Sequence, residues 1–432
     1  GVQTCALPIW HRKSYFPALI SEKNLEAEKD HVEGFAPEVF WVTRAGKNEL
    51  EEKMIMRPTS ETAMYPMYSL WINGKTDLPL KLYQSGPVWR YETKATKPFI
   101  RGREFYWIEA HDVFAKEEDA LAQVREDMET TEEMIHQSFG IPFIFFRRPQ
   151  WDKFAGSVNT YAADTLLPDG RALQLPSTHM LGNNFAKVFD VKYMDDEGEE
   201  EFCWQTCYGP SISRIFAALV SIHGDGHGMV LPFHLANVQV AIVPILKKGN
   251  EEKVLSHARG LEEALSQVFR TVLDSGDDTP GFKFNKWELL GAAVRVEVGE
   301  RDIEAGKAVV VRRDTGEKES VPFDELARRI VALGEEMNIA LREKADAWFS
   351  GMEKEADTLE ELKEAIENGG GFVKVPFCTD SREGEACADK VKEACAANIR
   401  GAKYGKEEIP EGKKCIACGK EAEIYQYASR QY

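Results

Sequence analysis

Residues 88–114 read VWRYETKATKPFIRGREFYWIEAHDVF, and no other stretch of the chain says as much about its fold. Apolar and charged residues are interleaved, which predicts two antiparallel strands joined by a loop at residues 93–100. Side chains two positions apart lie on one face of a strand, so Arg90 and Glu92 share a face. One face of the second strand carries Arg101, Arg103, Phe105, Trp107, Glu109 and His111. Buried charges without partners cost several kcal/mol, so this is not an ordinary core face.

Two interpretations of this hairpin stay open on the pattern alone. In the first, the charged face is solvated and its ion pairs form by chance. In the second, it lines a pocket that binds a polyanion through arginine and an amine through Glu61 and Glu109. Glu61 belongs to the upstream segment MRPTSETAMYPMY, where it lies two positions from Thr59 and shares a face with it if the chain is extended.

The composition is ordinary for a globular protein, and 432 residues are enough for two or three domains. No apolar run approaches the roughly 20 residues that span a bilayer, and no secretory signal is recognisable, so we expect a cytoplasmic protein without a membrane partner. The net charge of −18 leaves a nucleic-acid partner open, because such a partner needs only a local basic patch. Residues 1–9, GVQTCALPI, resemble translated adapter sequence, and we expect them not to be native.

Hydrophobic periodicity divides the chain into three expected domains. Residues 10–235 alternate strand-like and helical stretches, including a helix over 116–139. The run VQVAIVPIL opens an α/β domain over 236–345. A short cysteine-bearing domain follows at 346–432, and its NGGG segment at 368–371 is interpreted as a flexible joint.

The cysteines near the C-terminus predict a metal site. Cys378, Cys387, Cys415 and Cys418 form a C-x8-C…C-x2-C set, and four thiolates suit tetrahedral Zn²⁺ in a structural role. Cys387 is the least certain ligand, because its distance from Cys378 is long for such a site. Cys203 and Cys207 have no second pair, and we interpret them as small buried hydrophobes.

Several motifs together carry a family resemblance. The segment VWRYE…RGREFYWIEAH resembles motif 2 of the class II aminoacyl-tRNA synthetases. With RPTSET, KFAG, STHMLGNNF and HGDGHGMVLP, the chain over residues 12–432 is similar to the prolyl-tRNA synthetase family. The resemblance implies an antiparallel-sheet (α+β) catalytic domain, an α/β anticodon-binding domain and a small C-terminal α+β zinc-binding domain.

The resemblance also implies the reaction and its residues. Proline and ATP would form prolyl-adenylate with the help of Mg²⁺, and the prolyl group would then move to tRNA(Pro). Arg90 would bridge the proline carboxylate and the α-phosphate, and Arg101 would hold the distal phosphates, so both are expected to be catalytic. Gln174, Ser177 and Thr178 would contact ATP, with Ser177 and Thr178 interchangeable in this assignment. The proline pocket would consist of Thr59, Glu61, Arg90, Trp107, Glu109, Phe154 and His179.

The departures from the family pattern leave alternatives. His234 stands in LPFH where the family is expected to have an arginine against the adenine of ATP, and the motif 1 helix is missing. These changes support a catalytically impaired tRNA-binding paralogue as the alternative to a proline–tRNA ligase. A threonine enzyme is a third hypothesis, but it would need a catalytic zinc site in the core, for which no ligands are recognised. Only about 125 residues separate Arg103 from Gly228, too few for an editing insertion, which indicates the archaeal and eukaryotic-like type.

The resemblance extends to tRNA and to oligomeric state. Arg301, Arg312 and Arg313 are expected to contact the anticodon, since arginine can pair with a guanine edge and stack on an unpaired base. The alternative is that they form ordinary surface ion pairs. A homodimer is expected from the family.

Overall fold

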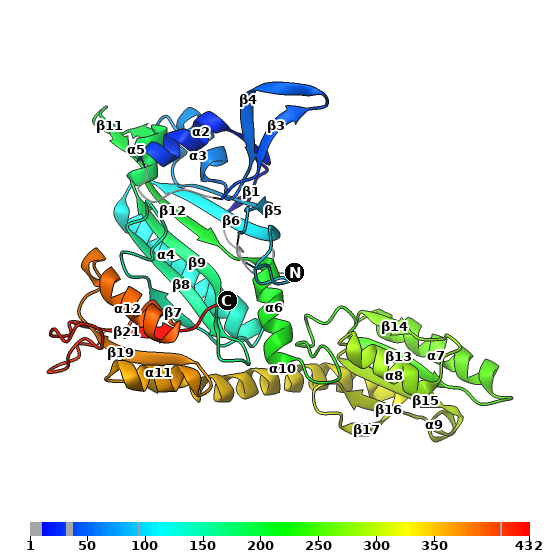
Figure 1. The fold of residues 1–432 in the computed structure, drawn as a ribbon. Helices are drawn as coiled ribbons and strands as arrows, with labels where there is room; N and C mark the ends of the chain where they lie inside the picture. The colour runs from blue at the N-terminus through cyan, green and yellow to red at the C-terminus, as the bar shows by residue number, and fades with distance from the viewer. Residues whose placement is uncertain (1–10, 32–37, 94, 407) are drawn as a thin grey trace. The chain divides into compact units, whose positions relative to one another are not determined.

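The computed structural model describes residues 11–31, 38–93, 95–406 and 408–432 (Figure 1). Residues 1–9, expected not to be native, lie outside these ranges. The chain forms two compact units, the first from segments 1–134, 143–218 and 349–432, and the second from segments 135–142 and 219–348. Among the described residues, no helix is both long enough and apolar enough to cross a membrane.

An eleven-stranded sheet runs through the first unit in the order β1-β5-β6-β12-β9-β8-β7-β20-β21-β19-β18. All neighbours are antiparallel except the pairs β1–β5 and β18–β19. The strands are β1 (Arg12–Lys13), β5 (Leu80–Trp89), β6 (Glu104–Phe114), β7 (Ile144–Arg147), β8 (Asn159–Leu166), β9 (Ala172–Gly182), β12 (Trp204–Gly209), β18 (Glu353–Glu355), β19 (Phe372–Phe377), β20 (Asn398–Lys403) and β21 (Ile424–Ser429).

The hairpin expected from the opening stretch is confirmed. Strands β5 and β6 pair from Leu80↔Val113 to Trp89↔Glu104. One detail of the prediction was wrong, because Arg101 and Arg103 precede β6 and lie in the connecting loop. That loop is longer than expected, since Arg90 donates its backbone N–H to the carbonyl of Arg103 and so closes the loop just beyond the last strand pair.

Helices and two small sheets complete the N-terminal part of this unit, which lies within residues 11–218. The helix expected over 116–139 is present as α4 (Glu117–Thr131), continued by a π-helical segment, η2 (Glu132–Ser138). The first turn of α4 carries acidic side chains, which interact favourably with the positive end of the helix dipole. The helix packs on β6, β9 and β12 (Figure 1). The remaining elements are β2 (Leu19–Ser21), α2 (Glu22–His31), β3 (Trp41–Ala45), β4 (Asn48–Met56), α3 (Glu61–Trp71), η1 (Lys75–Asp77), α5 (Asn184–Phe189), β10 (Lys192–Met194), β11 (Glu200–Phe202) and α6 (Ile212–His223).

The C-terminal segment is continuous with the large sheet. Strand β20 pairs with β7, so the segment adds its strands to those of the N-terminal part of the unit. The NGGG segment is not a free joint: the N–H of Gly371 donates to the carbonyl of Gly170, and a Cβ on Gly370 would lie 2.6 Å from that oxygen. The glycines permit a close backbone contact. The helical elements here are α11 (Leu359–Glu367), η4 (Arg382–Gly384) and α12 (Glu385–Cys395).

The second unit confirms the expected α/β pattern. Its five strands have the order β14-β13-β15-β16-β17, with β13 parallel to both of its neighbours. Helices α7, α8 and α9 pack on this sheet. Its elements are β13 (Val240–Ile245), α7 (Glu251–Ser266), β14 (Thr271–Leu273), α8 (Pro280–Leu289), β15 (Val294–Gly299), α9 (Glu300–Ala305), β16 (Lys307–Arg312), β17 (Lys318–Pro322), η3 (Phe323–Glu325) and α10 (Leu326–Ser350).

Candidate active site

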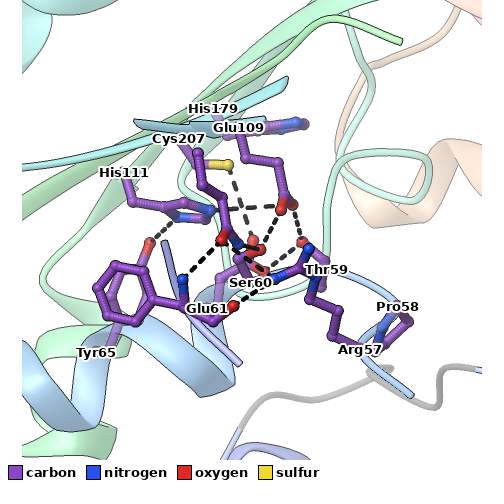
Figure 2. Close-up of polar contacts among 12 residues, drawn as sticks. Arg57, Pro58, Thr59, Ser60, Glu61, Tyr65, Glu109, His111, His179 and Cys207 are labelled. Carbon is purple, nitrogen blue, oxygen red and sulfur yellow. Dashed lines mark hydrogen bonds and ion pairs between the residues drawn. The ribbon is translucent and has the colours of Figure 1, made fainter. Parts of the chain in front are cut away.

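Two buried glutamates meet where α3 begins beside β6. The Thr59 hydroxyl lies 2.7 Å from Glu109 Oε1 and is also hydrogen-bonded to Glu61 Oε2 (Figure 2). Ser60 donates to the second oxygen of Glu109, and Gln84 donates to Ser60. A threonine hydroxyl carries one proton and cannot serve both carboxylates at once. The pair is therefore suited to a ligand with further N–H donors, such as an ammonium group.

Arg57, the first residue of the RPTSET motif, was given no role from the sequence, and it holds the loop that carries Thr59. It is 3% exposed, and its Nη1 donates to the carbonyl of Phe16 at 2.8 Å and to Gln84 Oε1 at 3.1 Å. A Cβ at Gly86 would lie 2.9 Å from Arg57 Nη2, so the glycine makes room for the guanidinium. Burial lowers the pKa of Arg57, while the charge of a nearby glutamate acts in the opposite direction.

Arg90 is positioned by aromatic rings. Its guanidinium carbon lies 5.3 Å from the ring centroid of Phe105 and 5.2 Å from that of Trp107, and its Nε donates to the carbonyl of Pro58 at 3.1 Å. Trp107 can lie against β12 because Gly209 has no side chain, since a Cβ there would be 2.8 Å from Trp107 Cζ2. The arginine is accessible to solvent and can contact a ligand.

Arg101 contacts a carboxylate and a backbone carbonyl group. Its Nη1 pairs with Glu92 at 2.9 Å, and its Nη2 donates at 2.8 Å to the backbone carbonyl oxygen of Tyr432. Lys97 lies over the Tyr432 ring, 4.2 Å from its centroid. The last residue of the chain is therefore part of the surroundings of the motif 2 loop.

Arg214 is a further candidate site residue, for which the sequence predicted no role. It lies in the first turn of α6 and donates from Nε to the carbonyl of Ile100 at 3.0 Å. Loss of solvent lowers the pKa of Arg214 to about 10, and the positive charges of Arg90 and Arg101 add to this shift. Three guanidinium groups that repel one another suit a polyanionic ligand. The sequence feature that could have indicated Arg214 is an arginine in the first turn of a helix that directly follows the buried strand β12.

His179 forms an uncharged wall of the site. Its Nε2 lies 3.0 Å from Ser177 Oγ and its Nδ1 lies 2.9 Å from Thr160 Oγ1. Desolvation lowers the pKa of His179 to about 3, so the imidazole is neutral near pH 7. The Phe154 ring lies 4.9 Å from the imidazole, centroid to centroid. The wall is thus flat and largely apolar.

Of the two residues that the sequence left interchangeable, only Ser177 lies on the face of His179. Thr178 points to the other face of β9 and donates to Asp127 on α4 at 2.7 Å. Gln174, also expected to contact ATP, accepts a hydrogen bond from Arg148 at 3.2 Å. The expected roles of these residues toward ATP stay predictions.

His234 belongs to the second unit. Its Nε2 lies 2.8 Å from Ser138 Oγ, and its carbonyl accepts a hydrogen bond from Arg270, both in that unit. Its expected role toward ATP stays a prediction.

The three arginines expected at the anticodon differ in their surroundings. Arg312 pairs with Asp314 through two nitrogens, and Arg313 pairs with Asp225 in the same way, at 2.7 and 2.8 Å. Arg301 lies exposed on α9 and has neither an ion pair nor a side-chain hydrogen bond within the described part of the chain. The alternative of ordinary ion pairs fits Arg312 and Arg313, and Arg301 is available to a ligand.

The four expected zinc ligands come together. Cys378, Cys387, Cys415 and Cys418 place their sulfur atoms within 4.8 Å of one another, and the Cys378 and Cys387 sulfurs are 3.7 Å apart. Cys387, the least certain ligand on spacing, belongs to this group. Cys395 does not, and its thiol donates to the carbonyl of Val391. Four converging thiols are a donor set that fits Zn²⁺.

Comparison with known proteins gives three consecutive family matches. Residues 40–223 match the class II tRNA synthetase core domain (G, H, P, S and T), residues 239–333 the anticodon binding domain, and residues 359–432 the prolyl-tRNA synthetase C-terminal domain.

Whole-chain relatives agree with these matches. The chain is 50% identical to the proline–tRNA ligase of Thermofilum pendens, covering 98% of this chain and 87% of that protein. It is 43% identical to the proline–tRNA ligase of Pyrococcus horikoshii, and the match covers 98% of this chain and 88% of that protein. Among solved structures, Giardia lamblia prolyl-tRNA synthetase in complex with prolyl-adenylate matches with a TM-score of 0.94 at 35% identity, covering 100% of this chain and 90% of that one. The chain therefore belongs to the prolyl-tRNA synthetase (proline–tRNA ligase) family of class II aminoacyl-tRNA synthetases.

Proposed function

We propose that this chain joins proline to tRNA(Pro) in two steps at the site described above. The proline carboxylate first attacks the α-phosphate of ATP, which gives prolyl-adenylate and releases pyrophosphate. The terminal ribose hydroxyl of the tRNA then attacks the prolyl carbonyl and releases AMP. The observation that carries this proposal is the meeting of an arginine cluster with a pair of buried carboxylates in one site.

The arginines act on the phosphates. Arg90 bridges the proline carboxylate and the α-phosphate, Arg101 holds the distal phosphates, and Arg214 adds the third positive charge. Charge that builds up at the α-phosphorus is stabilised by donors that are already in place, as in other phosphoryl transfers. Arg101 exchanges its contacts with Glu92 and Tyr432 for phosphate oxygens when ATP binds.

The carboxylates act on the amino acid. The secondary ammonium of proline donates to Glu61 and to Thr59, and Glu109 adds negative charge behind them. The ring of proline lies against Trp107 and Phe154. Because His179 is neutral, it does not repel the ammonium group.

The expected domain boundaries at 235 and 345 separate three ranges, each of which would have its own activity. Residues 10–235 activate proline, residues 236–345 bind the anticodon through Arg301, and residues 346–432 form a zinc-bearing C-terminal domain. Zn²⁺ held by the four cysteines would stabilise this last segment, and Mg²⁺ would neutralise ATP phosphates. A cytoplasmic homodimer remains part of the proposal, and sedimentation analysis of the purified chain tests the dimer.

The alternative of a catalytically impaired paralogue rested on His234 and the missing motif 1 helix. Arg214 supplies a positive charge next to Arg90 and Arg101. The histidine at position 234, where the family is expected to have an arginine, therefore does not leave the proposed phosphate site without a third positive charge.

Proline-dependent exchange of pyrophosphate into ATP tests the proposed function. The wild-type chain should show exchange with proline and not with threonine. Arg90→Ala should lower the exchange rate by at least about 100-fold, because removal of one transition-state donor commonly costs that much. Full exchange by Arg90→Ala would refute the role given to Arg90, and exchange with threonine alone would refute the proline assignment.

A further inference from the structure

Three side chains of types that commonly bind metal ions come from three different elements and meet beside the proposed ammonium site. Glu61 opens α3, His111 lies on β6 and Cys207 lies on β12, and all three are buried. One ligand atom from each lies within 4.8 Å of the others (Figure 2). Carboxylate, imidazole and thiolate are the ligands that Zn²⁺ uses in proteins.

His111 is oriented for a metal ion. Its Nδ1 lies 2.9 Å from the hydroxyl of Tyr65, and the Tyr68 hydroxyl donates to its backbone carbonyl at 3.0 Å. Among the described residues, Nε2 has no hydrogen-bond partner, and the nearest carboxylate oxygen recorded, on Glu109, is 4.0 Å away. Metal-bound histidines use one ring nitrogen for the ion and the other for a fixed hydrogen-bond partner, which is the arrangement of His111.

The other two ligand atoms are close to the required spacing. Cys207 Sγ lies 3.8 Å from Glu61 Oε1, while the second oxygen of Glu61 is hydrogen-bonded to Thr59. A tetrahedral zinc with bonds of about 2.0–2.3 Å has ligand atoms roughly 3.3–3.8 Å apart. Contraction of the group by about 1 Å or less would therefore complete three corners of a tetrahedron and leave the fourth corner open.

We propose that Glu61, His111 and Cys207 bind a zinc-class divalent cation in the amino-acid pocket. The carboxylate of Glu109 next to the group adds negative charge that favours a cation. The cation occupies Glu61, so it excludes the ammonium group of proline; this consequence rests on the proposed function. The site is an inhibitory one, at which zinc and proline compete.

Zinc content separates this site from the four-cysteine site. Wild-type chain saturated with Zn²⁺ and desalted should retain one more zinc per chain than Cys207→Ser, measured by elemental analysis. Cys203→Ser, which changes the other buried cysteine of the same core cluster, should retain as much zinc as the wild type. Cys418→Ser removes a ligand of the four-cysteine site and should leave the extra zinc in place. A saturating prolyl-adenylate analogue should displace the extra zinc from the wild type.

Kinetics test the competition. Added Zn²⁺ should raise the KM for proline in pyrophosphate exchange without changing kcat, and Cys207→Ser should need at least about 10-fold more zinc for the same effect, because loss of even an outer contact to a metal ligand costs about that much. Equal zinc content in folded wild type and Cys207→Ser would overturn the metal site. Extra zinc that leaves KM unchanged would overturn the competition. A chain with no proline-dependent exchange at any zinc concentration would refute the proposed function, while its zinc content would still decide the metal site.

Discussion

Arg214 is the residue whose role depends most on its neighbours. Its pKa is lowered because its own guanidinium is buried and because the positive charges of Arg90 and Arg101 lie nearby, and such a cluster is stabilised when phosphates bind. We predict that Arg214→Ala lowers kcat for pyrophosphate exchange by about 100- to 1,000-fold, the usual loss for a donor to a transition-state oxygen. Steady-state exchange assays with saturating proline measure this.

His234 provides the comparison for Arg214. The family resemblance implied that the group against the adenine is at position 234, while the structure places Arg214 close to Arg90 and Arg101. His234→Ala should change the KM for ATP much less than Arg214→Ala does. A large rise in the KM for ATP in His234→Ala, with none in Arg214→Ala, would show that His234 binds ATP and that Arg214 does not.

His179 makes stability depend on pH with a definite sign. Its pKa is about 3 in the folded chain against an ordinary value of 6.5, so between these values the unfolded chain binds the proton more tightly. Stability from His179 is complete above about pH 6.5 and is lost as the pH falls toward about 3. The free energy of unfolding of wild type minus that of His179→Gln, from urea titrations, should therefore decrease between pH 7 and pH 4.5. A difference that stays constant over this range would contradict the lowered pKa.

At the scale of elements, the β5–β6 hairpin shows what the alternation of apolar and charged residues predicts correctly and what it does not. The pattern predicted the strands and one face of β6, but every residue from Ile108 to Val113 is buried, so both faces of this strand are covered. Helix α4 covers one face, and the glutamate pair lies on the other. The interpretation of a solvated charged face is wrong, because Glu109 and His111 are buried.

The glycine segment 369–371 gives a prediction about a turn. Gly369 and Gly371 both have positive φ, +95° and +101°, but a Cβ on Gly371 would lie 2.2 Å from the carbonyl oxygen of Met352, whereas one on Gly369 meets nothing within 4 Å. Gly371→Ala should therefore be less stable than Gly369→Ala by about 1–3 kcal/mol, the usual cost of a forced clash. Thermal or urea unfolding of the two variants measures the difference, and equal stability would show that the backbone can move apart.

At the scale of the whole molecule, activation of proline and recognition of tRNA are assigned to different units. Arg301 lies exposed in the second unit without an ion-pair partner among the described residues. We predict that Arg301→Glu weakens tRNA binding by at least about 10-fold and leaves pyrophosphate exchange unchanged, because a phosphate or base contact becomes a repulsion. Filter binding and exchange assays on one preparation measure both.

Arg328 supplies the control for a general charge effect. It is also exposed in the second unit, where it pairs with Glu325. Arg328→Glu should leave tRNA affinity close to that of the wild type. An equal loss for both variants would assign the effect to net charge, and no loss for Arg301→Glu would favour a role for Arg301 as an ordinary surface residue.

The C-terminal segment joins the N-terminal part of the first unit through the pairing of β20 with β7, and its residue Tyr432 contacts Arg101. Sequence spacing could indicate that Cys378, Cys387, Cys415 and Cys418 bind a metal, because the two cysteines of the C-x2-C pair are held near each other by local geometry. It could not show that this segment extends the large sheet, because strand pairing between positions about 250 apart leaves no local pattern.

The sequence by itself determined the hairpin, the α/β pattern of the second unit, the cysteine site and the family, since each of these depends on periodicity or on motifs within short stretches. The tertiary structure alone decided that Arg214 joins Arg90 and Arg101, that Thr178 faces away from Ser177's site, and that the NGGG segment is a tight contact. It also decided that Glu61, His111 and Cys207, separated by 50 and 96 positions, form one group. Such groups arise when strands distant in sequence pair side by side, and spacing along the chain carries no record of that distance in space.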